Sequence, residues 1–136
     1  MILELSVGTS HDVESLRIIL SDPYFVLPTI FPSIKGLKIL GGSFQGYANY
    51  LGIEHQVSGN IYISKNEVTY PFTLSKGKNL GAGKLTFYLI PGRVLIRLEY
   101  EGWMERLAGG LLRGWVKKFS NDLEEKVRME RIKRKI

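Results

Sequence analysis

Hydrophobic residues recur at intervals of three or four positions along the last third of the chain. This spacing places them on one stripe of a helix with 3.6 residues per turn, and it predicts an amphipathic helix from about residue 103 to residue 135. Such a stripe needs a hydrophobic surface to cover, and the strands that precede the helix are the one candidate large enough. The stripe consists of Met104, Leu107, Leu111, Trp115, Phe119, Leu123 and Val127.

Short hydrophobic runs separated by turn residues fill the middle of the chain. They predict strands over residues 34–40, 44–55, 57–64, 67–74, 83–90 and 93–100. Because tight turns join consecutive strands, we expect an antiparallel meander. Alternate residues of the later strands are hydrophobic, so one face of this sheet should meet the helix. Gly46 and Gly52, inside one predicted strand, indicate bends where the sheet curls strongly.

The N-terminal part of the chain combines one strand with two short helices. Residues 3–7 alternate hydrophobic and polar side chains, which is the period of a half-buried strand. We expect Ser10 to cap the first helix. Asp22 and Pro23 should be the N-cap and first residue of the second helix, and prolines at positions 28 and 32 should keep that helix short.

The order of one strand, two small helices, six strands and a long helix resembles that of the helix-grip superfamily. This superfamily includes START lipid-transfer domains, plant pathogenesis-related allergens and polyketide cyclase-like (SRPBCC) proteins. The chain is also similar to a small archaeal family within it, for which no activity is implied. The most specific local motif is a proline-punctuated run that leads into the strand beginning at Ile34: Leu20-Ser21-Asp22-Pro23, Leu27-Pro28 and Phe31-Pro32.

The resemblance covers residues 1–136 and implies an α+β fold. In that fold a curved antiparallel sheet of about seven strands wraps around the long C-terminal helix, and two short helices follow the first strand. The resemblance also implies a cavity between sheet and helix that binds lipids, sterols, quinone-like or polyketide molecules.

Length and composition are those of one soluble domain. A chain of 136 residues can bury about two-thirds of the surface that it exposes when unfolded. The absence of cysteine excludes disulfides, thiolate zinc sites and cysteine nucleophiles. Glu4 stands where a signal peptide would carry basic residues, and no apolar run approaches the ~18 residues of a membrane span. We therefore expect a single cytoplasmic domain over residues 1–136.

The net charge of +6 is concentrated at the C-terminal end. Residues 126–136 hold six bases and one acid, a surplus of five, whereas residues 1–125 carry 13 bases and 12 acids. A helix from residue 103 to 135 would be about 50 Å long, against about 37 Å for a compact domain of this length, so this basic helical tail should overhang. Two interpretations are open, a solvated helix end and a contact with an anionic membrane surface. Nucleic acid is not expected as a partner, because exposed aromatics do not interleave with the bases.

Aromatic residues are the expected walls of any cavity between sheet and helix. Those on strands and on the long helix should face inward, and those on the small helices would close one end. Tyrosine hydroxyls are the expected groups to orient a ligand, although the same side chains could simply fill the space as core. The candidate ligand-binding residues are Phe25, Phe31, Tyr70, Phe72, Phe87, Tyr100, Leu111 and Trp115.

Three glycines, Gly109, Gly110 and Gly114, lie within the predicted long helix. Each costs about 1 kcal/mol relative to alanine in a helix interior, so an offsetting reason is expected. One interpretation is a gate, in which small side chains leave room for a ligand or let the helix flex. The other is close packing of this helix against the sheet or a second subunit.

Candidates for catalysis are few. His11 and His55 lie far apart without carboxylates at metal-ligand spacing, so we expect surface or strand residues and no metal. Glu99 and Glu101 alternate with the inward residues of their strand, which predicts a solvated outer face. No cofactor is expected.

The expected function is non-catalytic binding or transport of a hydrophobic small molecule in the cavity between sheet and helix. A cyclase- or aromatase-like enzyme is the first alternative, and it would need an ionisable residue that points inward. A homodimeric interaction module with a filled cavity is the second alternative.

Overall fold

The computed structural model describes residues 1–50 and 52–136 of the chain. These residues form eight strands and three helices in the order expected from the sequence. They are β1 (Ile2–Gly8), α1 (Val13–Leu20), α2 (Pro23–Ile30), β2 (Lys35–Leu40), β3 (Ser43–Tyr50), β4 (Ile53–Asn60), β5 (Tyr62–Ile63), β6 (Glu67–Lys76), β7 (Asn79–Ile90), β8 (Arg93–Gly102) and α3 (Glu105–Arg134). The two-residue β5 is the strand that the sequence did not predict separately.

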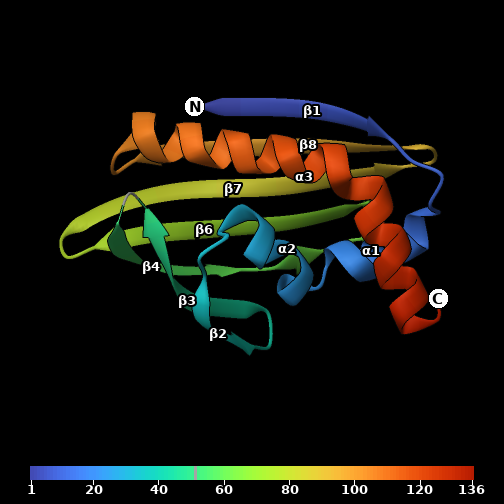
Figure 1. Cartoon of the computed structure of the whole chain (residues 1–136), viewed down its shortest axis with the longest axis horizontal. Helices are drawn as coiled ribbons and strands as arrows, with labels where there is room; N and C mark the ends of the chain where they lie inside the picture. The colour runs from blue at the N-terminus through green and yellow to red at the C-terminus, as the bar shows by residue number, and fades with distance from the viewer. Residues whose placement is uncertain (51) are drawn as a thin grey trace.

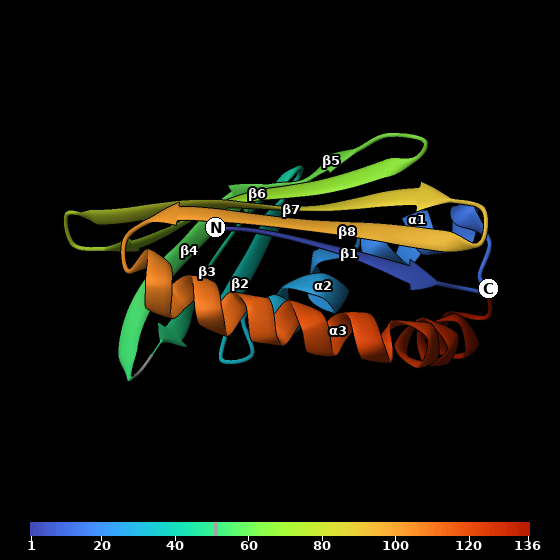
Figure 2. The ribbon, with the colours of Figure 1, turned by 90° about the horizontal axis from the view of Figure 1, so that it is seen from above.

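The strands form one antiparallel sheet in the order β1-β8-β7-β6-β4-β3-β2, and β5 pairs only with β6. All three helices lie on the same face of this curved sheet, and α3 runs along β8 and β1 (Figures 1 and 2). The fold predicted from the sequence, a curved antiparallel sheet around a long C-terminal helix, is therefore confirmed.

The predicted strand over residues 44–55 contains β3, a turn and only the first residues of β4, and Tyr50 pairs with Ile53 across that turn. The boundary predicted between strands 44–55 and 57–64 is wrong, because β4 continues through it to Asn60. Gly52 lies in the turn between β3 and β4 with φ of +79°, a left-handed conformation that glycine adopts without strain. Gly46 stays inside β3. The predicted bend at Gly52 is thus a complete reversal of the chain.

The N-cap of α2 is the residue predicted from the sequence, whereas the N-cap of α1 is not. Asp22 caps α2 as expected, and its carboxylate accepts the Tyr24 N–H at 2.9 Å. Asp12, rather than Ser10, caps α1, and it accepts the N–H of Ser15 at 3.0 Å. Ser10 instead binds a glutamate of α3, so a tertiary contact overrides a local one.

The buried stripe of α3 departs from the predicted one in its first half. Phe119, Leu123 and Val127 are buried as expected, but Leu107 is 53% exposed and Met104 precedes the helix. In this half of the helix a second, adjacent line of residues is buried instead of the predicted one. Both lines are apolar, and the way the helix lies on β8 and β1 decides which of them faces the sheet. The buried side chains of this second line are Ala108, Leu112 and Val116.

Three contacts hold the second half of α3 against the N-terminal part of the chain. Glu124 accepts hydrogen bonds from the Thr9 hydroxyl at 2.6 Å and from the N–H and hydroxyl of Ser10. Further along, Arg131 lies 3.6 Å from the carboxylate of Asp12, and Arg134 pairs with Asp22. The last turns of α3 therefore lie beside α1 (Figure 1) instead of overhanging, because two of the six basic residues are paired with acids of the small helices.

Gly59 allows β4 and β6 to approach closely where the sheet curves. A Cβ atom at this position would lie 2.1 Å from the Pro71 carbonyl oxygen and 2.7 Å from the Phe44 ring. We expect Gly59→Ala to lower the free energy of unfolding by about 1–3 kcal/mol, because backbone must move to relieve the overlap. Urea denaturation followed by circular dichroism measures the change. The matched variant is Gly8→Ala, where no atom lies within 4 Å of the added carbon, and an equal loss in both variants would contradict this explanation.

The Glu124 carboxylate makes the stability of the fold dependent on pH. Burial raises its pKa, but the hydrogen bonds from Ser10 and Thr9 outweigh burial and lower the pKa from 4.5 to about 2. The stabilisation is therefore complete above about pH 4.5 and is lost as the pH falls toward 2.

We expect Glu124→Gln to lower the free energy of unfolding at pH 7 by about 1 kcal/mol and to flatten its decline between pH 4.5 and pH 2. Denaturation curves across this range provide the measurement, with Glu101→Gln, at an exposed position, as the control. A pH dependence that is unchanged in Glu124→Gln would show that another carboxylate is responsible.

Candidate functional site

The predicted cavity residues lie between the concave face of the sheet and the helices, four of them on strands and four on or beside helices. Phe31, Tyr70, Phe72, Phe87 and Tyr100 are buried, whereas Phe25, Leu111 and Trp115 are half-buried. The structure thus brings the predicted residues into one continuous apolar interior.

These aromatic rings pack against one another. The Phe87 ring lies 6.0 Å from that of Phe119 on α3 and 6.4 Å from that of Tyr70. Phe72 contacts Phe31 edge to face at 5.3 Å and stacks on Tyr100 at 6.4 Å. The centre of the predicted cavity is therefore occupied by the walls themselves, and a ligand there would have to displace side chains.

Two of the expected orienting hydroxyls already serve the fold. Tyr70 donates its hydroxyl to the Leu20 carbonyl at 2.6 Å, which ties β6 to the end of α1. Tyr100 donates to the Trp103 carbonyl at 2.5 Å and fixes the turn between β8 and α3. Neither hydroxyl is therefore free to donate to a ligand.

A third tyrosine, which the sequence analysis did not select, lies at the centre of an aromatic group near the start of α3. Its ring centroid is 5.1 Å from that of His55, 5.6 Å from that of Trp115 and 6.4 Å from that of Phe31. We call this group the Tyr50 cluster, and it consists of Phe31, Tyr50, His55, Trp103 and Trp115.

The Tyr50 hydroxyl has no hydrogen-bond partner among the described residues, although the side chain is 97% buried. It is the one buried side-chain polar atom in residues 1–50 and 52–136 left in this state. Burial is the main cause that raises the pKa of this phenol, and the neighbouring Tyr100 is the second. The hydroxyl therefore remains a neutral donor. An unmade hydrogen bond at such a position costs about 1–3 kcal/mol, and a ligand that accepts the bond would recover that energy.

His55 is held in one neutral form by two hydrogen bonds. Its Nδ1 lies 2.9 Å from the Ile53 carbonyl and its Nε2 lies 2.9 Å from the indole nitrogen of Trp103. Since an indole N–H can only donate, Nε2 is the acceptor and the proton resides on Nδ1. His55 is a strand residue of β4, one of the two positions expected for it, and it is 2% exposed and links β4 to the turn before α3.

The first turns of α3 lack a side-chain N-cap and contain three glycines, although the Met1 ammonium group lies 3.3 Å from the Glu105 carboxylate. Met104 precedes the helix in a left-handed conformation and makes no side-chain cap. Added Cβ atoms at Gly110 and Gly114 would meet nothing within 4 Å, so close packing within this chain does not explain these two glycines. At Gly109 an added Cβ would only touch the Met1 side chain at 3.5 Å. The glycines therefore lower the stability of the helix next to the Tyr50 cluster.

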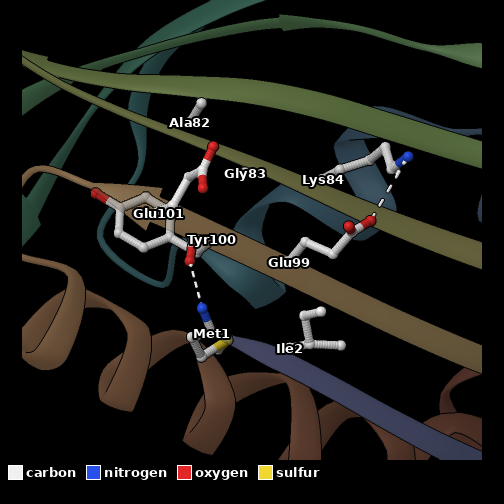
Figure 3. Close-up of a pocket in the computed structure, with 8 residues that line it drawn as sticks. All are labelled: Met1, Ile2, Ala82, Gly83, Lys84, Glu99, Tyr100 and Glu101. Carbon is white, nitrogen blue, oxygen red and sulfur yellow. Dashed lines mark hydrogen bonds and ion pairs between the residues drawn. The ribbon is translucent and has the colours of Figure 1, made fainter.

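The charged residues of β8 lie on the outer face of the sheet, as their alternation predicts. Figure 3 shows a hollow there, in which Lys84 lies 3.5 Å from Glu99. At its rim the Met1 ammonium group donates to the Tyr100 carbonyl at 2.9 Å. Because Lys84 and Arg97 pair with Glu99, this hollow does not offer a pair of free carboxylates for acid–base work. Its lining residues are Met1, Ile2, Ala82, Gly83, Lys84, Glu99, Tyr100 and Glu101.

Within residues 1–50 and 52–136, histidine, aspartate and glutamate side chains do not gather in groups of three that could hold a metal ion. Among the helices that the structure describes, α3 included, none combines the length and apolar character that crossing a bilayer requires.

The whole chain and its architecture are similar to those of known proteins. One protein-family model matches residues 1–136, the whole chain. The architecture that the match spans is the helix-grip (START/SRPBCC-like) fold expected from the sequence. The search of curated proteins found no match.

Several solved structures share the fold. A hypothetical protein from Sulfolobus tokodaii is 26% identical over 98% of this chain and 99% of its own, with a TM-score of 0.80. Ginseng major latex-like protein 151 from Panax ginseng is 15% identical over 92% and 95%, with a TM-score of 0.61. The Zhui aromatase/cyclase from Streptomyces sp. R1128 is 15% identical over 100% and 96%, also at 0.61. The latter two are similar in fold alone.

The unpartnered Tyr50 hydroxyl predicts opposite effects of two similar substitutions. Tyr50→Phe should leave the free energy of unfolding of the ligand-free protein unchanged or raise it by about 1 kcal/mol, because it removes an unpaired buried group. Tyr70→Phe should lower it by about 1–3 kcal/mol, because it leaves the Leu20 carbonyl without its donor. Thermal and urea denaturation compare the two variants. A large loss in Tyr50→Phe would reveal a partner that the hydroxyl needs in the free protein.

Proposed function

We propose that this protein binds a hydrophobic small molecule that carries one hydrogen-bond acceptor. The ligand lies between the concave face of the sheet and the first turns of α3, with its acceptor on the Tyr50 hydroxyl. Lipid-, quinone- and polyketide-like molecules have this combination of a large apolar body and a few carbonyl or hydroxyl oxygens. The observation that carries the proposal is the buried, unpartnered hydroxyl within an aromatic cluster.

The Tyr50 cluster supports binding because its surroundings are apolar apart from the one donor. Trp115 and Phe31 present ring faces and edges to Tyr50, and His55 has both nitrogens engaged. A ligand that buries about 300 Å² of apolar surface gains roughly 7 kcal/mol from desolvation. One hydrogen bond to Tyr50 adds orientation to that gain and selects molecules that carry an acceptor.

Ligand uptake requires the start of α3 to move, because the interior rings are in contact with one another. Trp103 bridges this segment to the sheet through its 2.9 Å bond to His55. Gly110 and Gly114, both exposed, weaken the following turns by about 1 kcal/mol each. The glycines therefore act as a hinge for a lid formed by the first turns of α3, and the Trp103–His55 bond is its latch.

A cyclase- or aromatase-like activity is less well supported by the same residues. An acid–base catalyst needs a group that exchanges protons near neutral pH. The pKa of Tyr50 is raised by burial, and both His55 nitrogens are used in hydrogen bonds. Binding without covalent chemistry is therefore the function that we propose, with no cofactor.

Native mass spectrometry of the protein purified from its own host tests this proposal. We expect a bound molecule of about a few hundred daltons, the size of a drug-like ligand, that is released by organic solvent. Tyr50→Phe should weaken rebinding of the extracted molecule by about two- to tenfold, the contribution of one neutral hydrogen bond. The control is Tyr24→Phe, which removes an exposed hydroxyl.

The latch has a separate kinetic test. Trp103→Phe keeps an aromatic ring but removes the donor to His55, so the extracted molecule should bind and dissociate faster while its Kd changes little. Stopped-flow quenching of the remaining tryptophan, Trp115, follows both rates. A protein that carries no ligand from its host and takes up none from a lipid extract, in wild type and in Trp103→Phe alike, would overturn the proposal. If that protein is also a dimer, the interaction module would be the better description.

A further inference from the structure

The last turns of α3 expose a short apolar strip that faces away from the rest of the protein. Met129 and Ile132 are 54% and 60% exposed, and they lie on the side of the helix opposite the fully buried Val127. Ile136, 46% exposed, follows the end of the helix and folds back so that its N–H binds the Arg131 carbonyl at 3.0 Å. We call Met129, Ile132 and Ile136 the C-terminal strip.

Cationic side chains flank this strip on both sides. At about 100° per residue, Lys126 and Lys133 fall on one flank of Met129 and Ile132, and Arg128 falls on the other. Lys126 and Lys133 are exposed, and the ion pairs of the described chain do not include them. Glu125 falls between Met129 and Ile132 one turn earlier, and its carboxylate is paired with Arg128. From Lys126 onward the strip has an apolar centre with cationic flanks, which is the pattern of helices that lie in a membrane interface.

A hollow beside the strip gathers further cations around a fixed floor. Arg128, Arg131 and Lys135 line it together with Ile132, Ile136 and the buried His11. Arg131 is held in place there, since its guanidinium donates to His11 Nδ1 at 3.1 Å and to the Ile136 carbonyl at 3.0 Å. Arg128 is paired with Glu125 through two nitrogens and Arg131 lies 3.6 Å from Asp12, whereas Lys135 has no acidic partner among the ion pairs of the described residues. A phosphate group in this hollow would therefore bind Lys135 and share the two guanidinium groups with these acids, beside the two isoleucines.

The position of this surface suits contact with an extended plane. Figures 1 and 2 place the last turns of α3 at one end of the long axis of the molecule, far from the β6–β7 turn. The same turns are fastened to the start of α2 by the ion pair of Arg134 with Asp22. The strip is therefore presented by a helix that is already folded, which lowers the cost of ordering on binding.

We propose that the last turns of α3 dock onto the surface of an anionic lipid bilayer, with Met129, Ile132 and Ile136 entering the boundary between headgroups and acyl chains. Lys126, Lys133 and the hollow formed by Arg128, Arg131 and Lys135 contact the lipid phosphates. This docking does not depend on the function proposed above, because the Tyr50 cluster lies near the opposite end of α3. It would bring a carrier of hydrophobic cargo to the surface where that cargo resides.

The chemistry of the strip favours a bilayer over other polyanions. Nucleic acid would engage the cations but would leave the exposed apolar side chains of the strip facing phosphates and water. A lipid interface suits both the cationic and the apolar side chains of this surface, because lipid headgroups pair with lysine and arginine while the apolar side chains leave water.

Vesicle flotation provides the test, with phosphatidylcholine vesicles alone and with about 30% phosphatidylglycerol. We expect binding only to the anionic vesicles, and we expect it to fall steeply when salt is raised from about 0.1 M to 0.5 M. Lys126→Gln with Lys133→Gln should reduce the partition coefficient about fivefold for each charge removed. Met129→Ser with Ile132→Ser, which keeps every charge, should reduce it by at least about tenfold.

Matched variants elsewhere on the surface complete the design. Lys76→Gln with Lys78→Gln removes two exposed charges, and Leu80→Ser with Leu40→Ser removes two exposed apolar side chains, all outside the last turns of α3. These variants should bind anionic vesicles like the wild type. Equal binding to both vesicle types, an unchanged partition of the Met129→Ser and Ile132→Ser variant, or equal losses in the remote variants would each overturn the proposal. So would tighter binding to a duplex oligonucleotide or a dimer that the serine variant dissociates.

Discussion

The packing of α3 on the concave face of the sheet is the interaction on which the rest of this structure depends. A curved sheet with one apolar face cannot remain exposed to water, and a single long helix covers most of it. Phe119 stands at the centre of this contact, since its ring meets Phe87 on the sheet and Phe25 on the second small helix at 6.0 Å each. Sheet, small helices and long helix therefore share one core, and the movement of any one of them affects the other two.

The two halves of α3 are fastened differently, and the proposed functions follow from that difference. The second half is held to the N-terminal segment by Glu124, Arg131 and Arg134, each of which contacts residues more than a hundred positions away. The first half has an uncapped start and two exposed glycines, and it rests on the cluster that contains the unpaired Tyr50 hydroxyl. A firmly held end can present a surface to a partner, whereas a weakly held end can open.

Residues whose burial follows from the local backbone period could be predicted from the sequence. Residues that depend on contacts between distant segments could not. Strand alternation correctly put Tyr70, Phe72, Phe87 and Tyr100 inside, because the period of two is a property of the backbone itself. Tyr50 follows the same alternation in β3, which also buries Phe44 and Ala48, but treating β3 and β4 as one strand concealed it. Recognising Gly52 as a turn would have restored the register and with it the candidate site. The position of His55 could not be predicted in this way, since its Trp103 partner is 48 positions away.

The sequence by itself determined the order of elements, the antiparallel meander and the existence of one long amphipathic helix. These features follow from local periodicity, proline and glycine positions and capping residues, all of which act within a few residues along the chain. Only the tertiary structure decided which apolar row of α3 is buried, which tyrosine keeps a free hydroxyl and where the basic tail lies. Each of those outcomes depends on contacts between distant segments, such as Arg134 with Asp22, and their energies are of the same size as the local preferences that they override.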